Sequence, residues 1–289
     1  MKLCRFNDNR IGVVRGGQIH DVTGIAAELP AQRYPLAPGD PLIARLAELR
    51  SKMEKLADAA KPVPAEAVKF LSPVANPSKI IGTPVNYHAH RLEADKDKDI
   101  AVYSPSTRAR PIEEQGLFLK AVSALVGASE GVAVRFPERR TDHEAELGLV
   151  IGKRASKVPE SRALDHVAGY AIALDMVVRG PEDRSFRKSI DTYAVLGPWL
   201  VTADEVGDPA NLSFTLKVNG ELRQASNTRH MVMSIPRQIS WASQWYDLLP
   251  GDIIMTGTCE GVGRVVPGDV MSLEFERIGA MDVKVRAAT

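Results

Sequence analysis

The chain contains 289 residues, 44% of them hydrophobic and 25% charged, and its 37 basic side chains nearly balance its 36 acidic ones. This balance argues against a dedicated nucleic-acid binder and against a polybasic membrane anchor, and no apolar run reaches the roughly 20 residues that a transmembrane helix needs. The first residues lack the apolar core of a signal peptide, and two cysteines at opposite ends of the chain suit a reducing compartment, so we expect a cytoplasmic protein.

The composition of the chain changes near residue 75. Before that point lie short strand-like segments, a proline-rich stretch and an amphipathic segment, from about Pro41 to Ala60, that predicts a helix. Further prolines between Pro62 and Pro77 are typical of a linker. We therefore predict a small amino-terminal domain over residues 1–75 and a larger domain over residues 76–289.

The larger domain is predicted to be rich in strands. Its apolar segments bounded by Gly, Pro or Asp are Ala133–Phe136, Ala145–Ile151, Gly169–Asp175, Trp199–Val201, Ser213–Val218 and Asp252–Met255. Val270–Glu276 and Met281–Arg286 predict a strand pair that turns at Gly279, and Asn219-Gly220 predicts a hairpin. The clearest helix is Ser234–Leu248. Because strands and helices do not alternate regularly, the pattern predicts a strand-dominated α+β fold rather than a doubly wound sheet.

Three acidic residues adjoin these apolar segments. Glu144 and Glu146 are two residues apart, so in a strand they project from one face, and the apolar run Leu147–Ile151 follows them. Neighbouring carboxylates need a cation or a basic group between them, for which a hard divalent cation is the simplest choice. The alternative is a solvent-facing strand end with two ordinary glutamates. Asp175 is either a third oxygen ligand or a capping residue paired with Arg179.

The segment around His90 offers a candidate general base. His90 and Glu93 are three residues apart, so on a helical turn the carboxylate could orient the imidazole. The alternatives are a zinc pair with His88 on a strand and a structural histidine. The polar stretch Arg91–Arg110 follows, which is either a mobile lid over a site or a solvated loop.

Two further segments carry candidate polar groups. Lys188, with aromatic and apolar neighbours, could bind a substrate carboxylate or stabilise an enolate, or it could belong to a solvated basic cluster. The glycine-rich segment Met255–Gly263 indicates either close backbone approach to a ligand or a plain turn. Cys259 within it is a weak candidate nucleophile, because the sequence places no base beside it.

Taken in order, these motifs resemble the fumarylacetoacetate hydrolase family from about Ile80 to the carboxyl terminus. The matching motifs are Asn86-Tyr87-x-x-His90-x-x-Glu93, Leu117-Phe118-Leu119-Lys120, His143-Glu144-x-Glu146-Leu147, Gly169-Tyr170 with Asp175, Lys188-Ser189, Leu196-Gly197-Pro198-Trp199, Val218-Asn219-Gly220-Glu221, Pro250-Gly251-Asp252 and Thr256-Gly257-Thr258-x-x-Gly261. The chain departs from the family pattern at Thr83–Val85, Ala121, Gly180–Asp183 and Cys259, residues that we expect to line the pocket. The nearest branch contains acylpyruvate hydrolases, oxaloacetate decarboxylases and 2-hydroxyhepta-2,4-diene-1,7-dioate isomerases.

The resemblance implies a fold and a site. The fold would be the family's mixed β-roll, preceded by a small amino-terminal domain and assembled as a homodimer. Mg²⁺ or Mn²⁺ would bind to Glu144, Glu146 and Asp175, and His90 and Glu93 would form a catalytic dyad on a lid. Lys188 would act at the metal pocket, and the substrate-binding residues would be Arg179, Thr258 and Lys120.

The implied reaction is metal-dependent hydrolysis of a C–C bond in a small acylpyruvate-type 1,3-diketo acid. In that scheme His90, oriented by Glu93, takes a proton from the attacking water, and Lys188 adds positive charge beside the enolate. The same site could instead isomerise 2-hydroxy-dienedioates or decarboxylate oxaloacetate. A non-catalytic metal-binding relative is the alternative from another class.

Overall fold

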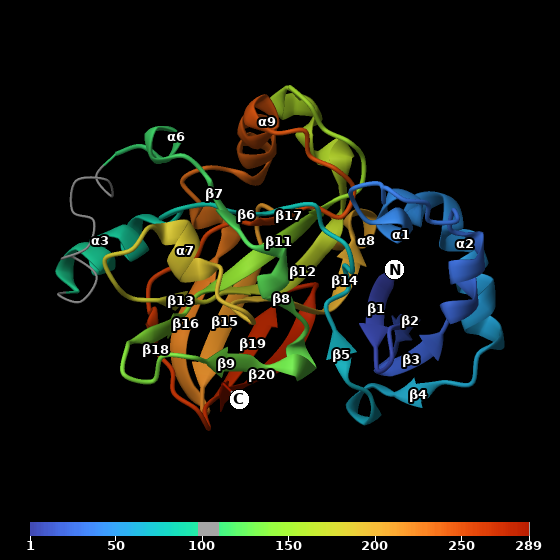
Figure 1. Ribbon diagram of the computed structural model, residues 1–289, viewed down its shortest axis with the longest axis horizontal. Coiled ribbons are helices and arrows are strands. Elements are labelled where there is room, and N and C mark those ends of the chain that lie inside the picture. Colours follow the sequence, from blue (N-terminus) through green and yellow to red (C-terminus); the bar gives the residue numbers. More distant parts are fainter. Residues whose placement is uncertain (98–109, 289) are drawn as a thin grey trace.

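The computed structural model describes residues 1–97 and 110–288, and its largest feature is one long mixed sheet (Figure 1). Among the described residues, ten of its strands follow the order β4-β3-β2-β1-β14-β12-β11-β17-β6-β7, with β5 paired to β1 and β8 to β14. The strands of this sheet are β1 Lys2–Phe6, β2 Arg10–Arg15, β3 Gln18–Asp21, β4 Val63–Pro64, β5 Phe70–Leu71, β6 Ile80–Gly82, β7 Phe118–Lys120, β8 Leu125–Val126, β11 Ala145–Ile151, β12 Val167–Asp175, β14 Ala194–Thr202 and β17 Ile253–Met255.

Two smaller sheets complete the β-structure of the described residues. The five-stranded sheet, in the order β16-β15-β19-β20-β9, contains β9 Val132–Val134, β15 Ser213–Val218, β16 Glu221–Asn227, β19 Val270–Phe275 and β20 Gly279–Ala287. The three-stranded sheet contains β10 Thr141–His143, β13 Val177–Val178 and β18 Gly263–Arg264. The α-helices in the described residues are α1 Pro41–Ala44, α2 Leu46–Ala59, α3 His88–Lys96, α6 Ile112–Gln115, α7 Arg184–Lys188, α8 Ala203–Val206 and α9 Ile235–Trp245.

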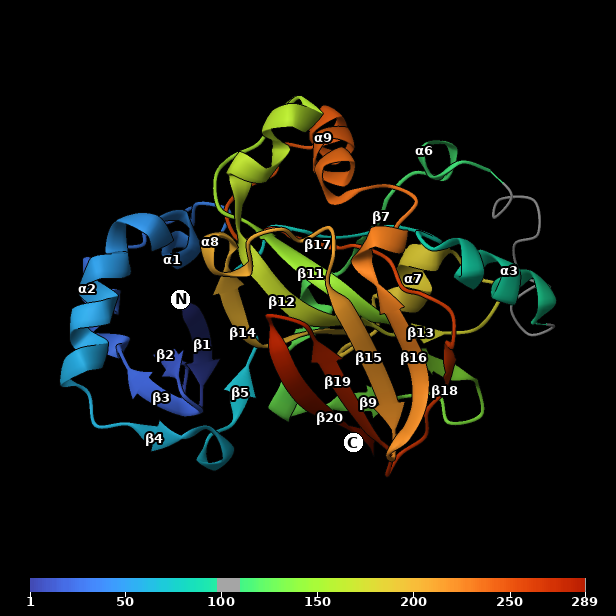
Figure 2. The ribbon, with the colours of Figure 1, turned by 180° about the vertical axis from the view of Figure 1, so that it is seen from behind.

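The alternation of side chains along β11 and β12 explains how the large sheet is buried on both faces. Ile172 and Leu174 join one apolar cluster with Phe214 and Leu273 of the five-stranded sheet, whereas the intervening Ala173 joins a second cluster that includes residues of α2. The strands are nearly continuous apolar runs because both faces are buried, one of them against the five-stranded sheet, which lies in front of β11 and β12 in Figure 2. The predicted strand-dominated α+β fold is confirmed.

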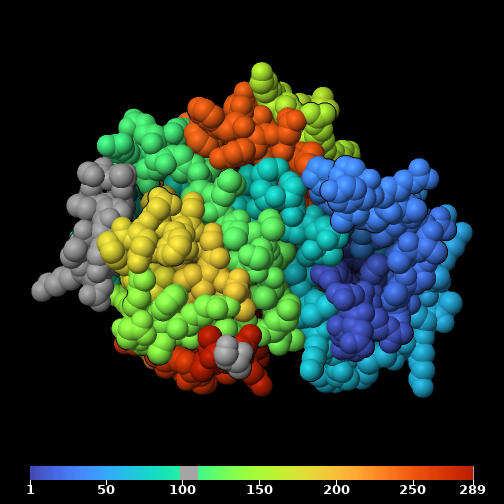
Figure 3. Space-filling model, viewed as in Figure 1, coloured from blue at the N-terminus to red at the C-terminus, as the bar shows by residue number. Residues whose placement is uncertain are grey.

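The amino-terminal residues extend the large sheet. Strand β1 pairs antiparallel with β14, with Lys2 opposite Val201, and residues 1–75 lie on the opposite side of the molecule from α7 (Figure 3). The helix predicted from Pro41 to Ala60 is divided at Arg45, whose backbone (φ −110°, ψ 10°) ends α1. The predicted domain boundary at residue 75 stays a prediction.

Most of the other predicted elements occur with small shifts at their ends. The hairpin forms at Asn219 and Gly220, which both adopt positive φ (51° and 84°), as a tight two-residue turn requires. Helix α9 starts after the Ser234 cap but ends at Trp245, three residues before the predicted end. Gly279 is the first residue of β20, not the turn itself. None of the described helices is both long and apolar enough to cross a lipid bilayer.

Candidate active site

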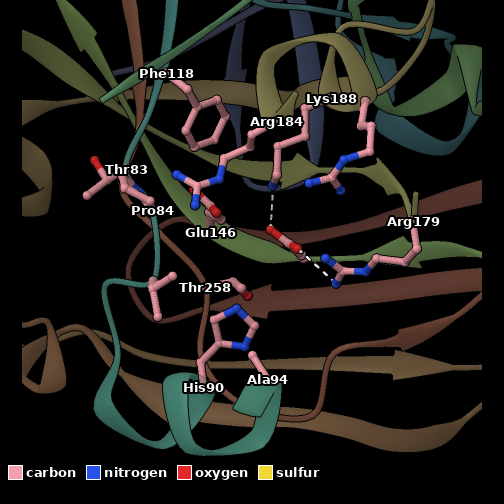
Figure 4. Close-up of a pocket in the computed structure, with 13 residues that line it drawn as sticks. Thr83, Pro84, His90, Ala94, Phe118, Glu146, Arg179, Arg184, Lys188 and Thr258 are labelled. Atoms are coloured by element: carbon pink, nitrogen blue, oxygen red, sulfur yellow. Dashed lines mark hydrogen bonds and ion pairs between the residues drawn. The ribbon is translucent and has the colours of Figure 1, made fainter. Parts of the chain in front are cut away.

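A pocket opens where the end of the large sheet meets α3 and α7 (Figure 4). The residues that line it are Thr83, Pro84, Val85, His90, Ala94, Phe118, Glu144, Glu146, Arg179, Arg184, Arg187, Lys188 and Thr258. His90 lies on one side of the pocket, while Arg184, Phe118 and Lys188 lie on the opposite side. Six of the lining residues are site residues predicted from the sequence: the ionisable His90, Glu144, Glu146, Arg179 and Lys188, and Thr258.

The three predicted acidic residues come together in the buried interior. Oxygen atoms of Glu144, Glu146 and Asp175 all lie within 4.8 Å of one another, and the three side chains are buried. Glu146 and Asp175 belong to the adjacent strands β11 and β12, and the amide of Asp175 donates to the carbonyl of Glu144 (2.9 Å), which sets the register between them. The predicted alternative of two glutamates at a solvent-facing strand end is wrong, because both side chains are buried.

Two buried lysines lie among these carboxylates. Lys188 Nζ donates to Glu144 Oε2 (2.6 Å) and to Asp175 Oδ2, and Lys120 Nζ donates to Asp175 Oδ1. Burial works to lower the pKa of Lys188, but Asp175 and Glu144 outweigh it and raise that pKa. Burial dominates at Lys120 and, together with the nearby charge of Lys188, lowers its pKa, although Asp175 acts in the opposite direction. Lys120 is not among the pocket-lining residues, so it reaches the site through Asp175.

Glu144 and Glu146 differ in their electrostatic surroundings. Burial favours the neutral form of both, but Lys188 and Arg179 outweigh it at Glu144 and lower its pKa to about 2. At Glu146, burial and repulsion from Asp175 raise the pKa well above its usual value. Glu146 Oε2 accepts a hydrogen bond from the amide of Gly257 (2.7 Å), and no described residue donates to Oε1. Glu146 is therefore a buried acid in need of a further positive partner.

Arg179 links the acidic group to its surroundings. Its guanidinium donates to Asp142 (2.7 Å) and to Glu144 Oε1 (3.3 Å), rather than to Asp175 as the sequence allowed. Asp142 is completely buried and also accepts from Arg140 (2.7 Å). Arg140 in turn pairs with Asp97, just beyond α3 (2.9 Å). A continuous charged network thus connects Glu144 to the end of α3.

His90 and Glu93 lie on α3, as the spacing predicted, with His90 Nδ1 3.5 Å from Glu93 Oε2. Both carboxylate oxygens of Glu93 also accept from the amide of Gly261 (3.0 and 3.1 Å), which docks α3 onto the glycine-rich loop. Burial would raise the pKa of Glu93, but the bonds from His90 and Gly261 outweigh it and lower that pKa. His88 is exposed on the helix, so the alternative of a strand zinc pair is wrong. Most of the predicted lid, residues 98–109, lies outside the described residues.

The glycine-rich loop after β17 approaches the site through its backbone. Gly257 adopts φ +97°, and a Cβ there would lie 2.4 Å from the Cβ of Asn86, so the loop can supply its amide to Glu146 only with glycine at this position. Thr258 lines the pocket, but its hydroxyl donates to the carbonyl of Ala145 (2.8 Å) and accepts from Gln224 (2.8 Å). Burial raises the pKa of Cys259 to about 12, which opposes a role as nucleophile.

Several residues of the site had no assigned role from the sequence. Arg184 and Arg187 lie on α7 and face the same pocket as Lys188. Phe118 packs against two cations, with Lys188 Nζ 5.2 Å and Arg184 Cζ 5.5 Å from its ring centroid. The spacing of Arg184, Arg187 and Lys188 at i, i+3 and i+4 was the available signal, but it required knowing that residues 184–188 form a helix.

The donor set suits a hard divalent cation. Mg²⁺ and Mn²⁺ prefer oxygen ligands, and the three carboxylates supply an all-oxygen set whose oxygens lie within 4.8 Å of one another. The fold and site together define a strand-rich protein with a buried carboxylate triad, a nearby lysine and a His–Glu pair on an adjoining helix.

Comparison with known proteins identifies the class. The chain belongs to the fumarylacetoacetate hydrolase family, because residues 79–286 match the family model described as "Fumarylacetoacetate (FAA) hydrolase C-terminal". It is 50% identical to the maleylpyruvate hydrolase of Aquipseudomonas alcaligenes over 99% of this chain and 100% of that protein. It is 38% identical to a mitochondrial oxaloacetate tautomerase of Xenopus laevis over 74% of this chain and 67% of that protein.

A solved structure resembles the whole chain. The crystal structure of maleylpyruvate hydrolase from Sphingobium sp. SYK-6, in complex with manganese(II) ion and pyruvate, covers 100% of both chains with a TM-score of 0.83 and 40% sequence identity. The predicted family and the predicted family fold are therefore confirmed.

Proposed function

We propose that this protein is a divalent-metal-dependent hydrolase that cleaves a C–C bond of an acylpyruvate-type 1,3-diketo acid. The observation that carries the proposal is that Glu144 and Glu146 of the carboxylate triad line the same pocket as His90, which is far from them in the sequence. The hydrolase class predicted from the sequence is borne out by the relatives, of which one is a maleylpyruvate hydrolase at 50% identity. The roles of individual residues below are part of the proposal.

Glu144, Glu146 and Asp175 would hold Mg²⁺ or Mn²⁺. When bound, such an ion polarises the carbonyl groups of a 2-oxo acid and stabilises negative charge on the adjacent carbon. Lys188, held between Glu144 and Asp175, keeps its proton and supplies a fixed positive charge beside the same carboxylates. Lys120 fixes the orientation of Asp175 from behind the pocket.

His90 would act as the general base for water. Glu93 lies on the Nδ1 side of its ring and, by accepting from that nitrogen, would leave Nε2 without a proton and able to take one from water. Glu93 is itself anchored by the Gly261 amide, so the imidazole is held relative to the loop that carries Thr258. His90 and Lys188 lie on opposite sides of the pocket, which separates proton removal from charge stabilisation (Figure 4).

The test is an assay of acylpyruvate cleavage, followed by release of pyruvate, with the chain stripped of metal and then given Mg²⁺ or Mn²⁺. We expect cleavage only with metal, its loss in Glu144→Ala, and a fall in His90→Ala while metal binding persists. Glu274→Ala, an exposed residue of β19, is the matched control and should leave cleavage unchanged. Full cleavage in the presence of a chelator and in Glu144→Ala would sink the proposal.

A second function uses the same site without activating water. Stabilisation of an enolate also supports tautomerisation or decarboxylation of oxaloacetate and isomerisation of a 2-hydroxy-dienedioate, and one relative is an oxaloacetate tautomerase. His90→Ala separates the two reactions, because hydrolysis needs the base for water and decarboxylation does not. A variant that retains oxaloacetate decarboxylation but not acylpyruvate cleavage would assign both activities to one pocket.

The proposal includes the setting of the enzyme. Both cysteines, Cys4 and Cys259, are free and buried, which fits the expected cytoplasmic location. The homodimer implied by the family resemblance belongs to the same proposal, and light scattering of the purified protein measures it directly.

A further inference from the structure

The segment that leads from β6 to α3 contains a tight turn with an unfavourable backbone conformation. Residues 83–86 form this turn, with Pro84 at its second position and Val85 at its third. Val85 has φ +47°, in the left-handed region. Turns with positive φ at the third position ordinarily have glycine or asparagine there, because Cβ otherwise lies close to the following carbonyl oxygen, and branching at Cβ makes the conformation worse. The chain thus keeps a valine where glycine would fit better.

The side chain of Val85 offers no hydrogen bond that would compensate this conformation. Among the described residues, Thr192 is the other β-branched residue with positive φ (73°), and its hydroxyl accepts a hydrogen bond from the amide of Ala133 (2.8 Å). The remaining non-glycine residues with positive φ are asparagines or have side chains that are unbranched at Cβ. Valine carries no polar side-chain atom, so its value at this position comes from what its methyl groups contact.

Both ends of the turn are fixed to neighbouring elements. The amide of Thr83 donates to the carbonyl of Met255 (3.0 Å), and its hydroxyl donates to Gln238 Oε1 (2.7 Å). Asn86 is completely buried, and its side-chain amide donates to the carbonyl of Thr256 (2.7 Å). A residue in a sparsely populated conformation persists where its surroundings hold it there, and such residues cluster at functional sites. The fixed ends of this turn supply that restraint.

Val85 belongs to the apolar part of the active-site pocket. The apolar residues that line the pocket in the described part of the chain are Pro84, Val85, Ala94 and Phe118. The ring of Phe118 packs against two cations, whereas Ala94 follows His90 by one turn of α3 and lies beside it (Figure 4). The pocket encloses only about 70 Å³, so the isopropyl group of Val85 takes up space that a bound substrate would otherwise occupy.

We propose that Val85 is a specificity-determining residue that narrows the pocket beside the carbonyl group attacked by water, so that the enzyme selects acylpyruvates whose acyl group is unbranched next to that carbonyl. This inference rests on the proposed function, since it assumes that His90 activates water in this pocket. The attacked carbon then lies within reach of that water, and the first carbon of the acyl group is bonded to it. Branching at this first carbon adds bulk in the part of the pocket that Val85 and Ala94 line.

The experiment compares butanoylpyruvate with 2-methylpropanoylpyruvate, two isomers of equal charge that differ only in branching next to the attacked carbonyl. In the unaltered enzyme we expect kcat/KM to favour butanoylpyruvate. Val85→Ala and Val85→Gly should each raise the ratio of kcat/KM for the branched isomer to kcat/KM for the straight isomer by roughly 10-fold, the discrimination that a pocket achieves over one methylene group. Comparing each ratio with that of the unaltered enzyme cancels the intrinsic reactivity of the two substrates. Val266→Ala, which shortens an exposed valine outside the pocket, is the matched control and should leave the ratio unchanged.

Two further readouts separate the size of the side chain from the strain of the backbone and from catalysis. Alanine keeps a Cβ in the left-handed region, whereas glycine adopts this conformation freely. Val85→Gly should therefore melt at a higher temperature than Val85→Ala, although both substitutions widen the pocket. The uncleavable isomers 2-oxoheptanoate and 5-methyl-2-oxohexanoate, titrated with Mn²⁺ present, should show tighter binding of the straight isomer to the unaltered protein and equal binding of the two isomers to each variant.

The results can overturn either idea separately. If the acylpyruvates are cleaved but the ratio of the two isomers is the same in both variants as in the unaltered enzyme, Val85 does not determine specificity and the hydrolase proposal stands. An equal loss of kcat/KM for both isomers would assign the valine to the placement of α3 instead. A Val85→Gly protein that melts below Val85→Ala would contradict the backbone strain. If the unaltered protein cleaves neither isomer, the proposed function fails, and the uncleavable pair still decides whether Val85 excludes branched chains.

Discussion

Replacing Glu146 by Gln is expected to stabilise the metal-free protein while abolishing its metal binding. Glu146 has oxygens within 4.8 Å of oxygens of both Glu144 and Asp175. Two unit charges at that distance repel by about 3.5 kcal/mol at an effective dielectric constant of about 20. The attraction of Lys188 offsets part of the repulsion, so we expect a net gain of about 1–3 kcal/mol, or roughly 2–6 °C in melting temperature. The glutamine oxygen can still accept from Gly257.

The effect should depend on pH with a defined sign. The pKa of Glu146 is raised in the folded state, so between the unfolded pKa and this raised value the folded chain binds more protons than the unfolded one. The stability of the metal-free protein therefore falls as pH rises through that window, and the advantage of Glu146→Gln grows with pH. Added Mn²⁺ should raise the melting temperature of the unaltered protein, more so at higher pH, because the ion neutralises the carboxylate.

The assay is thermal unfolding with chelator and with Mn²⁺ across a pH series, using the exposed Glu274→Gln as the control. A Glu146→Gln protein that is less stable than the parent without metal, and is still stabilised by Mn²⁺, would contradict both the repulsion and the ligand role of this residue.

Three further expectations follow from the same geometry. His90→Ala should lower acylpyruvate turnover by about 10²- to 10⁴-fold, the usual contribution of a general base, and Glu93→Gln should lower turnover less. If His90→Ala instead loses Mn²⁺ affinity in calorimetry by the same factor as it loses turnover, His90 is a metal ligand. Gly82→Ala should destabilise the fold by about 1–3 kcal/mol in urea unfolding, because its Cβ would meet the ring of Phe118; an unchanged midpoint would show that the ring shifts freely. The pKa of Glu144 is lowered to about 2, so its carboxylate should contribute about 3 kcal/mol of folding stability above its unfolded pKa, and this contribution should be lost as the pH falls toward 2. Glu144→Gln should flatten this part of the plot of stability against pH in acid unfolding. A plot of unchanged shape would refute the charge assigned to Glu144.

The strands of this chain were predictable where an apolar run in the sequence has a clear physical cause. The run Leu147–Ile151 is apolar throughout because β11 is buried on both faces, and the ends of β11, Ala145 and Ile151, match the predicted ends. The break between α1 and α2 at Arg45 was not predictable, because the helical pattern of apolar residues continues through Arg45 in the sequence. Tertiary packing determines where the helix is interrupted.

The acidic residues of the site were predictable for a related reason. An acid at the end of an apolar strand must be compensated if it is buried, and Glu146 and Asp175 stand at such ends, so the sequence marked them as candidate partners of a cation beside more ordinary alternatives. The basic residues carry no such signal. Arg187 resembles any surface arginine in the sequence, and only the structure reveals that it is buried and donates to the backbone carbonyl of Glu182.

Long-range contacts account for the remaining differences. Gln224 lies in an exposed-looking segment of β16, yet its side chain joins Thr258, Cys259 and the amide of Ala145 in the interior. Asp142 likewise binds Arg140 and Arg179, one close in sequence and one distant. These contacts depend on how sheets meet, which local periodicity does not encode.

The most direct test of the account is to measure bound metal and activity in the same samples. Metal-free protein is titrated with Mn²⁺, the bound ion is counted by electron paramagnetic resonance, and the initial rate of pyruvate release from an acylpyruvate is measured at each step. The account predicts that the rate rises from near zero in proportion to the bound ion and saturates at one ion per chain, and that Glu146→Gln and Asp175→Asn neither bind the ion nor turn over. Turnover in the metal-free protein, or Mn²⁺ bound equally well by both variants, would contradict it.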